Sequence, residues 1–268
     1  MGGYWMVRTV KSGKVVEKSQ FFVGDRKPRA PRKKGCSTLA KKDSNMNQAV
    51  RRLARVLNCN FGKGDLFFTL TYDAQHLDQI ENQPEKADKA CQLFWRRISR
   101  ALADIGIKIR GVWVTADKDE ATGNPVRLHH HLVVGAEGFD IKWVDRKLES
   151  CCINGRSIVD MWGNGSVHVE YLRQQDDYTA VANYMVRQSV GGMDVKKWHT
   201  SRGLKKPIIL SEKATASPHE LRAPGGADVK EISRYDEQTG SHYIRYIRRN
   251  DKTQLQEAAE MFYSGGVI

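Results

Sequence analysis

At residues 127–134 the chain reads RLHHHLVV, with three consecutive histidines leading into an apolar run. The β-branched and apolar residues after the histidines favour a β-strand. Side chains alternate between the two faces of a strand, so His129 and His131 should point to one face and His130 to the other. Two imidazoles on one face are half of a metal site, although imidazole alone suits several divalent ions. The alternative is an incidental histidine pair.

Composition indicates a soluble, globular and basic protein. The 268 residues are 40% hydrophobic, and Lys and Arg outnumber Asp and Glu by 44 to 31, a net charge of +13. This surplus favours nucleic acid as a partner, although a merely basic protein is the alternative. The five cysteines form no CxxC pair, which argues against a disulfide framework and a cysteine-based zinc site. With no signal-peptide pattern and no apolar run of membrane length, we expect a cytoplasmic protein with no membrane partner.

Residue patterns along the chain predict an α+β fold. Segments rich in aromatic and β-branched residues predict strands at 4–10, 15–23, 66–72, 107–116 and 166–172, the first two forming a hairpin. Apolar residues at helical spacing predict helices from Ser44 to Leu57, from Pro84 to Ile105, and from Asp176 or Asp177 to Gln188. The strand 107–116 and the histidine strand should be antiparallel neighbours, because a short polar turn connects them. Weaker patterns predict helices at 143–151 and 254–262 and a hairpin around residues 239–240.

Two basic stretches are candidate DNA-binding segments. Residues 26–35 combine two prolines with dense positive charge, which indicates an extended linker along phosphates or, alternatively, a solvated loop. A second basic loop follows at 198–207. The candidate DNA-binding residues of the two stretches are Arg26, Lys27, Arg29, Arg32, Lys33, Lys34, Arg202, Lys205 and Lys206.

Four features occur in a fixed order: FTLTYD at 68–73, the histidine strand, WGNGSVHVE at 162–170, and AVANYMVR at 180–187. In this order they resemble the rolling-circle replication initiators of the HUH endonuclease superfamily, in particular those of small single-stranded DNA phages and related plasmids. His129 and His131 match the His-hydrophobe-His motif, with His130 where a hydrophobe is usual. Tyr184 with Arg187 matches the tyrosine motif, in which lysine is the more common basic residue. The resemblance covers residues 60 to 210.

The resemblance implies a central antiparallel sheet of about five strands with helices packed on it. It implies an endonuclease domain at 37–213, between an N-terminal hairpin with basic linker at 1–36 and a C-terminal extension of unknown role at 214–268. It also implies Mg²⁺ or Mn²⁺ as cofactor, held by His129, His131 and a third ligand, usually acidic, histidine or glutamine, near the strand before the histidine pair. The candidate for that third ligand is Asp117, with Asp119 and Glu120 behind it.

The implied activity is the nicking and rejoining of single-stranded or hairpin origin DNA, with a host helicase and polymerase as candidate partners. Ala180 stands where two-tyrosine members have their first nucleophile, which leaves Tyr184 as the single nucleophile. Tyr178 is the rival, but it lacks a basic residue one turn further on. A neutral tyrosine hydroxyl, with a pKa near 10, is weak, so a metal that polarises the phosphate would assist it. A covalent phosphotyrosine intermediate would conserve the energy of the phosphodiester bond, which could then be used to rejoin the strand.

Two alternatives remain open. One is a transposase or relaxase with the same chemistry, against which the chain has no helicase-type GxxxxGK[ST] loop. The other is a non-catalytic basic DNA-binding protein with a structural metal, which would need four protein ligands.

The net charge predicts that DNA binding depends strongly on salt. With ~5 phosphate contacts on a single strand, the logarithm of the binding constant should fall with a slope of about −3.5 against the logarithm of the salt concentration. Deletion of residues 26–34 should flatten this slope in a fluorescence-anisotropy titration. An unchanged slope would show that the basic run is only a solvated linker.

Overall fold

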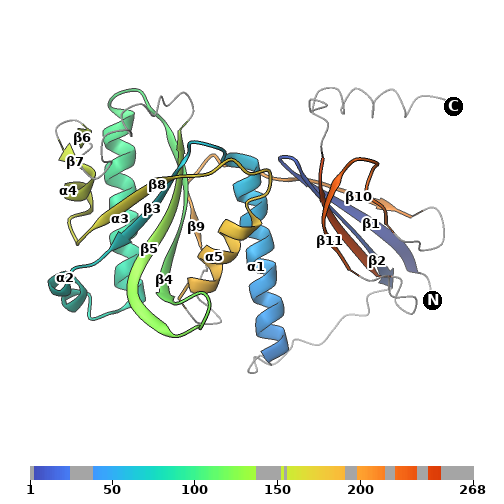
Figure 1. Ribbon diagram of the computed structural model, residues 1–268, viewed down its shortest axis with the longest axis horizontal. Coiled ribbons are helices and arrows are strands. Elements are labelled where there is room, and N and C mark those ends of the chain that lie inside the picture. Colours follow the sequence, from blue (N-terminus) through green and yellow to red (C-terminus); the bar gives the residue numbers. More distant parts are fainter. Residues whose placement is uncertain are drawn as a thin grey trace. The chain divides into compact units, whose positions relative to one another are not determined.

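The computed structural model describes residues 3–24, 39–136, 152–153, 156–190, 198–214, 221–233 and 241–248. The chain divides into two compact units, one of residues 33–207 and one that combines residues 1–32 with 208–268 (Figure 1). Each unit contains a five-stranded antiparallel sheet, and the larger one adds helices, so the expected α+β fold is confirmed. Within these described ranges, no helix is both long and apolar enough to span a membrane.

The larger unit is built on a sheet with the strand order β8-β3-β5-β4-β9. Its strands are β3 (Leu66–Thr71), β4 (Ile109–Lys118), β5 (Pro125–Ala136), β8 (Val167–Tyr171) and β9 (His199–Thr200). Its helices are α1 (Leu39–Asn60), α2 (Ala74–Gln79), α3 (Pro84–Ala103), α4 (Ile158–Trp162) and α5 (Thr179–Gln188). A small separate ladder joins β6 (Cys152–Ile153) to β7 (Arg156–Ser157).

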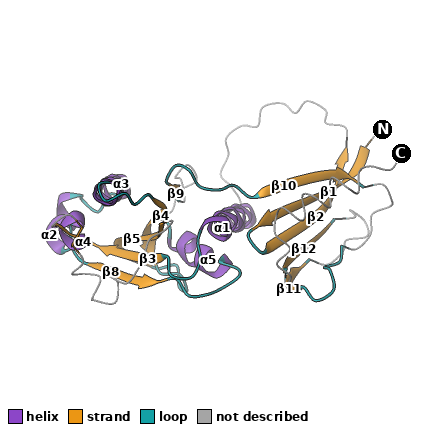
Figure 2. Cartoon of the chain, turned by 90° about the horizontal axis from the view of Figure 1, so that it is seen from above, coloured by secondary structure: helices purple, strands orange, loops and turns teal. Residues whose placement is uncertain are grey.

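Helices cover both faces of this sheet, with α3 on one side and α1 and α5 on the other (Figure 2). Phe68 and Leu132 of the sheet pack with Phe94 of α3 in one buried cluster. Phe67 and Val133, the neighbouring residues in each strand, belong to a second cluster with α1 and α5. Neighbouring residues of a strand face opposite sides, so both sides of β3 and β5 can be buried under helices.

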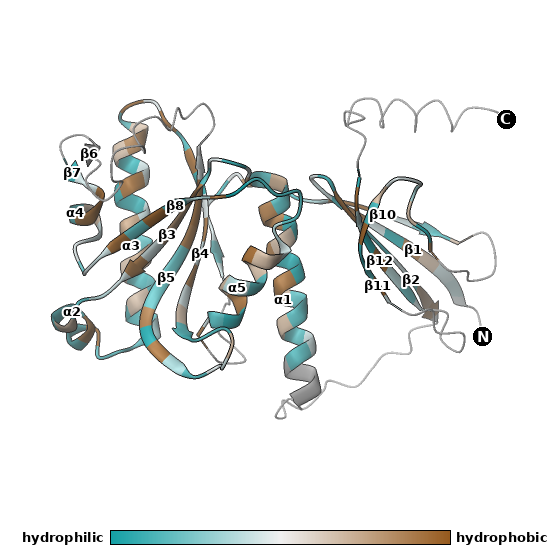
Figure 3. Cartoon of the chain, viewed as in Figure 1, coloured by the Kyte–Doolittle hydropathy of each residue, from teal (hydrophilic) through white to brown (hydrophobic). Residues whose placement is uncertain are grey.

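Helix α3 shows how the sequence produces this packing. Pro84 occupies its first turn, where the missing N–H costs nothing. Its buried residues recur at helical spacing and are Ala87, Cys91, Phe94, Ile98 and Leu102. Figure 3 accordingly shows hydrophobic and hydrophilic stretches alternating along the helix. Trp95 lies over Gly111 of β4, where a Cβ atom would collide with the indole ring, so the helix can approach this strand closely.

The histidine strand is confirmed as the central strand β5, with β4 and β3 as its antiparallel neighbours. His129, His130 and His131 lie opposite Thr71, Leu70 and Thr69 of β3. On the other side they lie opposite Ala116, Thr115 and Val114 of β4. The alternation expected from the sequence therefore holds, because His130 enters the core under α3 while its two neighbours face α5.

His130 is a fully buried core residue with both ring nitrogens hydrogen-bonded. Tyr72 donates its hydroxyl to the carbonyl of Ala87, so it accepts from Nε2–H of His130 at 2.8 Å. Nδ1 then accepts from the hydroxyl of Thr115 at 3.1 Å. Burial, with the charges of His129 and His131 as smaller causes, lowers the pKa of His130 to about 3. The ring is therefore neutral and packs edge-on against Trp162.

The smaller unit corrects the domain boundaries expected from the sequence. Its sheet has the order β10-β1-β2-β12-β11. The strands are β1 (Gly3–Ser12), β2 (Val15–Gly24), β10 (Ile208–Lys213), β11 (Asp228–Ile232) and β12 (His242–Ile247). The expected hairpins β1–β2 and β11–β12 are present, but β2 pairs with β12, so the N-terminal and C-terminal segments share one sheet. Residues 208–213, expected in the endonuclease domain, pair with β1 instead. These pairings join residues 197 to 232 positions apart, which local patterns do not reveal.

Element boundaries differ from the expectations in smaller ways. Helix α1 is longer at both ends than 44–57, and α2, β9 and β10 had no clear sequence signal. The N-cap of α5 is Tyr178, while Asp177 accepts hydrogen bonds from the N–H and hydroxyl of Thr179. The predicted helices at 143–151 and 254–262 lie outside the described residues.

The burial of His130 predicts a stability defect for His130→Ala. The substitution leaves a cavity and removes one hydrogen bond each from the hydroxyls of Tyr72 and Thr115, which should cost about 2–4 kcal/mol of unfolding free energy. Urea denaturation followed by circular dichroism measures this. His168→Ala, at an exposed position of the same sheet, is the matched control and should change stability by less than about 0.5 kcal/mol. Equal stability of the two variants would contradict the assigned packing of His130.

Candidate active site

Helix α5 carries the residues that face the histidine pair. Its buried side, with Ala182, Met185 and Val186, packs in the cluster shared with α1 and the sheet. Tyr184 and Gln188 are four residues apart, so they lie on one side of the helix, one turn from each other. This side is turned towards β5, where His129 and His131 lie.

The end of α5 is fastened directly to the sheet. Ser189 takes an extended conformation immediately after the helix and forms a β-bridge with Ala116 of β4. Val190 then donates its N–H to the carbonyl of Thr115 at 3.0 Å. Because Ala116 lies opposite His129, these bonds hold Gln188 close to the histidine pair.

Three side-chain atoms converge in a small triangle. Nε2 of His129 lies 3.1 Å from Nε2 of His131, and Oε1 of Gln188 lies 3.2 Å and 3.3 Å from these two nitrogens. Gln188 and His131 are buried, whereas His129 is half-buried at the rim. Two ring nitrogens and one amide oxygen therefore point at a common position.

Hydrogen bonds at the far side of each ring orient the imidazoles. The carbonyl oxygen of Arg127 lies 2.8 Å from Nδ1 of His129, so this nitrogen carries the proton and Nε2 keeps its lone pair. Oγ1 of Thr69 lies 3.2 Å from Nδ1 of His131 and accepts from it in the tautomer that frees Nε2. Such partners behind a ring are the usual support of metal-binding histidines.

A lowered pKa keeps His131 in the neutral form that metal coordination requires. Burial is the main cause that lowers the pKa of His131 to about 3, the charge of His129 adds to the effect, and the hydrogen bond with Gln188 opposes it. A neutral imidazole offers a lone pair, whereas an imidazolium does not.

The triangle has the dimensions of a ligand set for a divalent cation. With metal–ligand bonds of about 2.1 Å, adjacent ligand atoms are about 3.0 Å apart in an octahedron and about 3.4 Å apart in a tetrahedron. The measured edges of 3.1–3.3 Å lie between these values. Among the described residues, no three His, Cys, Asp or Glu side chains form such a group, so the third donor here is an amide.

Tyr184 lies at the open side of this triangle. Its ring centroid is 4.9 Å from that of His131 and 6.2 Å from that of Phe67. The side chain is 37% exposed, which leaves it accessible to a large substrate. The sequence analysis had expected this tyrosine, on α5, to face the two histidines.

Tyr178 has a structural environment instead. It is buried, and its hydroxyl donates to the carbonyl of Arg173 at 3.3 Å. Its backbone N–H donates to the side chain of Asn58 in α1. Burial, together with the nearby carboxylates Asp65 and Asp176, raises the pKa of Tyr178. These features make it a poorer nucleophile than an exposed tyrosine.

The acidic candidates Asp117 and Asp119 make other contacts in the structure. Asp117 lies where the register of β4 shifts, and its carboxylate is 3.9 Å from Nζ of Lys118. Asp119 accepts from the N–H groups of Ala121 and Thr122 and so closes its own turn. Among these side chains, the structure brings the amide oxygen of Gln188 within hydrogen-bonding distance of both histidines. The one-turn spacing from Tyr184 was the signal that could have identified it.

Arg187 is exposed and takes part in a surface network. Its Nε–H donates to Oδ1 of Asn183 at 2.8 Å, and Asn183 donates to the carboxylate of Glu120 at 3.1 Å. The guanidinium is therefore held on the outer side of α5, one turn from Tyr184.

The two basic stretches are only partly described. Arg202, Lys205 and Lys206 are exposed, and the backbone of Lys205 is held by two hydrogen bonds with the side chain of Asn60. The other candidates lie outside the described residues, and they are Arg26, Lys27, Arg29, Arg32, Lys33 and Lys34.

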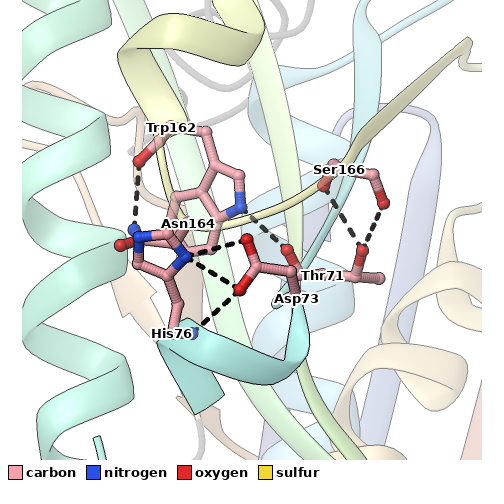
Figure 4. Close-up of polar contacts among 6 residues, drawn as sticks. All are labelled: Thr71, Asp73, His76, Trp162, Asn164 and Ser166. Carbon is pink, nitrogen blue, oxygen red and sulfur yellow. Dashed lines mark hydrogen bonds and ion pairs between the residues drawn. The ribbon is translucent and has the colours of Figure 1, made fainter. Parts of the chain in front are cut away.

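The segment 162–166 docks against the end of β3 and brings β8 alongside it (Figure 4). Trp162 donates its indole N–H to the carbonyl of Thr71 at 2.9 Å, and Asp73 donates its N–H to the carbonyl of Asn164 at 3.0 Å. A Cβ atom at Gly165 would collide with the backbone of Thr71 and Asp73, which explains the glycine. These contacts set the position of Ser166, whose hydroxyl meets that of Thr71.

Residues 65–189 match the family model described as replication-associated protein ORF2/G2P. The match spans a little under half of the chain, from β3 to the residue after α5, and includes the histidine pair, Tyr184 and Gln188. No curated protein and no solved structure gave a significant match. The family match supports a role in the initiation of replication, with DNA as the partner.

Proposed function

We propose that the chain is a replication initiator that cuts and rejoins one DNA strand through Tyr184. The observation that carries this proposal is the convergence of two imidazole nitrogens and one amide oxygen at a single position, with the ring of the exposed Tyr184 4.9 Å from that of His131. The match of this segment to a replication-associated family supports it.

His129, His131 and Gln188 are the residues that would hold Mg²⁺ or Mn²⁺. The bound ion would polarise the scissile phosphate and help to orient it. The two imidazoles and the amide are all uncharged. The three ligands would therefore not reduce the positive charge of the ion, which would attract the phosphate strongly. Arg127 and Thr69 hold the two rings in the orientation that presents Nε2.

Tyr184 is the nucleophile in this proposal. Its hydroxyl oxygen attacks the phosphorus atom, a bond forms between that oxygen and phosphorus, and the bond from phosphorus to the 3′ oxygen breaks. The tyrosine proton is lost to solvent, and the departing 3′ oxygen takes up a proton to become a 3′ hydroxyl. The 5′ end stays joined to Tyr184, and attack by a 3′ hydroxyl reverses the step and rejoins the strand.

Tyr184→Phe should abolish nicking, because a phenyl ring has no oxygen with which to attack phosphorus. The loss of one oxygen from an exposed position should leave the fold and the DNA affinity nearly unchanged. A labelled single-stranded oligonucleotide, resolved on denaturing gels, reports both the cut strand and the covalent protein–DNA adduct.

Tyr178→Phe is the matched control and should keep both cutting and the adduct. Peptide mapping of the wild-type adduct should locate the DNA on Tyr184. An adduct that persists in Tyr184→Phe would overturn the assignment of the nucleophile. Cutting without any adduct in the wild type would point to a metal-activated water instead.

Metal binding should depend on the triangle. His129→Ala and His131→Ala should each abolish both Mn²⁺ binding and cleavage. Gln188→Ala should weaken Mn²⁺ binding by at least about 10- to 100-fold, because the loss of even an indirect partner of a metal ligand costs that much. Electron paramagnetic resonance of free Mn²⁺ measures the affinity directly, without a nicking assay.

Asp117→Asn is the comparison for the third ligand and should bind Mn²⁺ like the wild type. If Asp117→Asn lost the metal while Gln188→Ala kept it, Asp117 would be the third ligand and the assignment of Gln188 would be wrong. His130→Ala should retain Mn²⁺ binding, because its ring lies on the other face of the sheet.

A further inference from the structure

One part of the sheet face that carries the histidine pair is polar. Helices α1 and α5 cover Phe67, Val112, Val114 and Val133 on this face. Towards the edge strand β8 the same face instead presents polar side chains that are exposed or half-buried. This surface, called here the polar shelf, consists of Thr69, Thr71, Ser166 and His168.

Strand register places the polar shelf directly beside the histidine pair. His168 lies opposite Thr69, and Thr69 lies opposite His131, so the three form one row across three strands. Thr71, which lies opposite His129, donates its N–H to the carbonyl of Ser166 and begins a second row. With strands about 4.8 Å apart, His168 is about 10 Å from His131. The rows therefore lead from the proposed metal ligands to the edge of the sheet.

The polar shelf has hydrogen-bond donors available to a ligand. The hydroxyls of Thr71 and Ser166 hydrogen-bond to each other with either one as donor, and Thr71 can also donate to the carbonyl of Ser166, so a ligand oxygen can take over one of these two hydroxyl hydrogens. Within the described structure, no hydrogen bond or ion pair engages the imidazole of His168. Exposed polar residues on an edge strand are often merely solvated. Here, however, the docked segment 162–166 holds them in place, and no helix covers them.

A second observation points to a ligand. An open hollow lies at the end of β3 and the start of β8, lined in part by Asp73, Gly165, Ser166 and His168. Asp73 is held there by its hydrogen bonds with the N–H and the imidazole of His76 (Figure 4). The hollow thus adjoins the outer row of the polar shelf, and its lining adds the apolar side chains of Tyr72, Val159 and Val167 to these polar groups.

We propose that the polar shelf binds the backbone of single-stranded DNA beside the scissile phosphate, with His168 and Ser166 as its contacts and the hollow receiving a base. This inference rests on the proposed function, because it assigns the path of the strand that Tyr184 would cut. Hydroxyl and N–H donors are the groups that proteins use for phosphate oxygens. The exposed carboxylate of Glu170, further along β8, would repel the phosphates and so confines the path to residues 166–168.

The test is a binding measurement with a metal chelator present, so that no cleavage is required. The probe is a fluorescein-labelled single-stranded oligothymidylate of about 20 nucleotides, longer than one binding site of this kind. His168→Ala and Ser166→Ala should each raise the Kd about fivefold, as the loss of one ordinary hydrogen bond implies. His168→Gln, which keeps an N–H donor, should recover most of the affinity.

Arg96→Ala is the matched control. Arg96 is exposed on α3, which covers the opposite face of the sheet, and its removal takes away a full positive charge. If binding reflected general charge alone, Arg96→Ala would weaken it at least as much as His168→Ala. That result would overturn the proposal, and so would an unchanged Kd for both His168→Ala and Ser166→Ala.

The outcomes separate this inference from the proposed function. Normal DNA affinity of His168→Ala, alongside a wild-type adduct on Tyr184, would overturn the polar shelf alone. Weakened affinity of His168→Ala without any wild-type adduct would overturn the proposed chemistry and leave the DNA site standing. In nicking assays His168→Ala should raise KM about fivefold with little change in kcat, since binding and not chemistry is affected.

Discussion

The β-bridge between Ser189 and Ala116 is the constraint on which the candidate site depends. It ties the last turn of α5 to the strand that pairs with His129. A helix packed on a sheet only through apolar side chains can slide or rotate by small amounts, because such contacts are not directional. Backbone hydrogen bonds remove that freedom, so Gln188 meets the histidine pair within hydrogen-bonding distance.

The three consecutive histidines serve two different purposes because a strand has two faces. His130 is neutral, buried and fully hydrogen-bonded, and it contributes to the core under α3. His129 and His131 keep their Nε2 atoms for a ligand, with Arg127 and Thr69 behind them. A one-residue change of register would exchange these roles and place two imidazoles in the core. The tight packing around His130 therefore also preserves the orientation of His129 and His131.

The sheet face that carries His129 and His131 is thus only partly covered by helices. The uncovered part could accommodate the single-stranded DNA of the proposed function. Helices α1 and α5 cover the apolar residues of β4 and β5 on this face. The part of the same face near β8 carries hydroxyl groups and an imidazole instead. An extended DNA strand could lie on such a surface without displacing any packed helix. The docked segment 162–166 supplies rigidity at this edge, since Trp162 and Gly165 leave little room for movement.

The sequence by itself determined most of the long strands, the main helices and the orientation of the three histidines. Alternation and helical spacing are local properties, so the histidine pair, Tyr184 and the antiparallel pairing of β4 with β5 could be read from short segments. Only the tertiary structure decided what depends on distant residues meeting. The joining of β2 with β12 in one sheet is such a case, and so is the approach of Gln188 to the histidine pair. Asp117 is nearer in sequence to the histidines, but the register shift in β4 and the fastening of α5 bring the more distant amide to them.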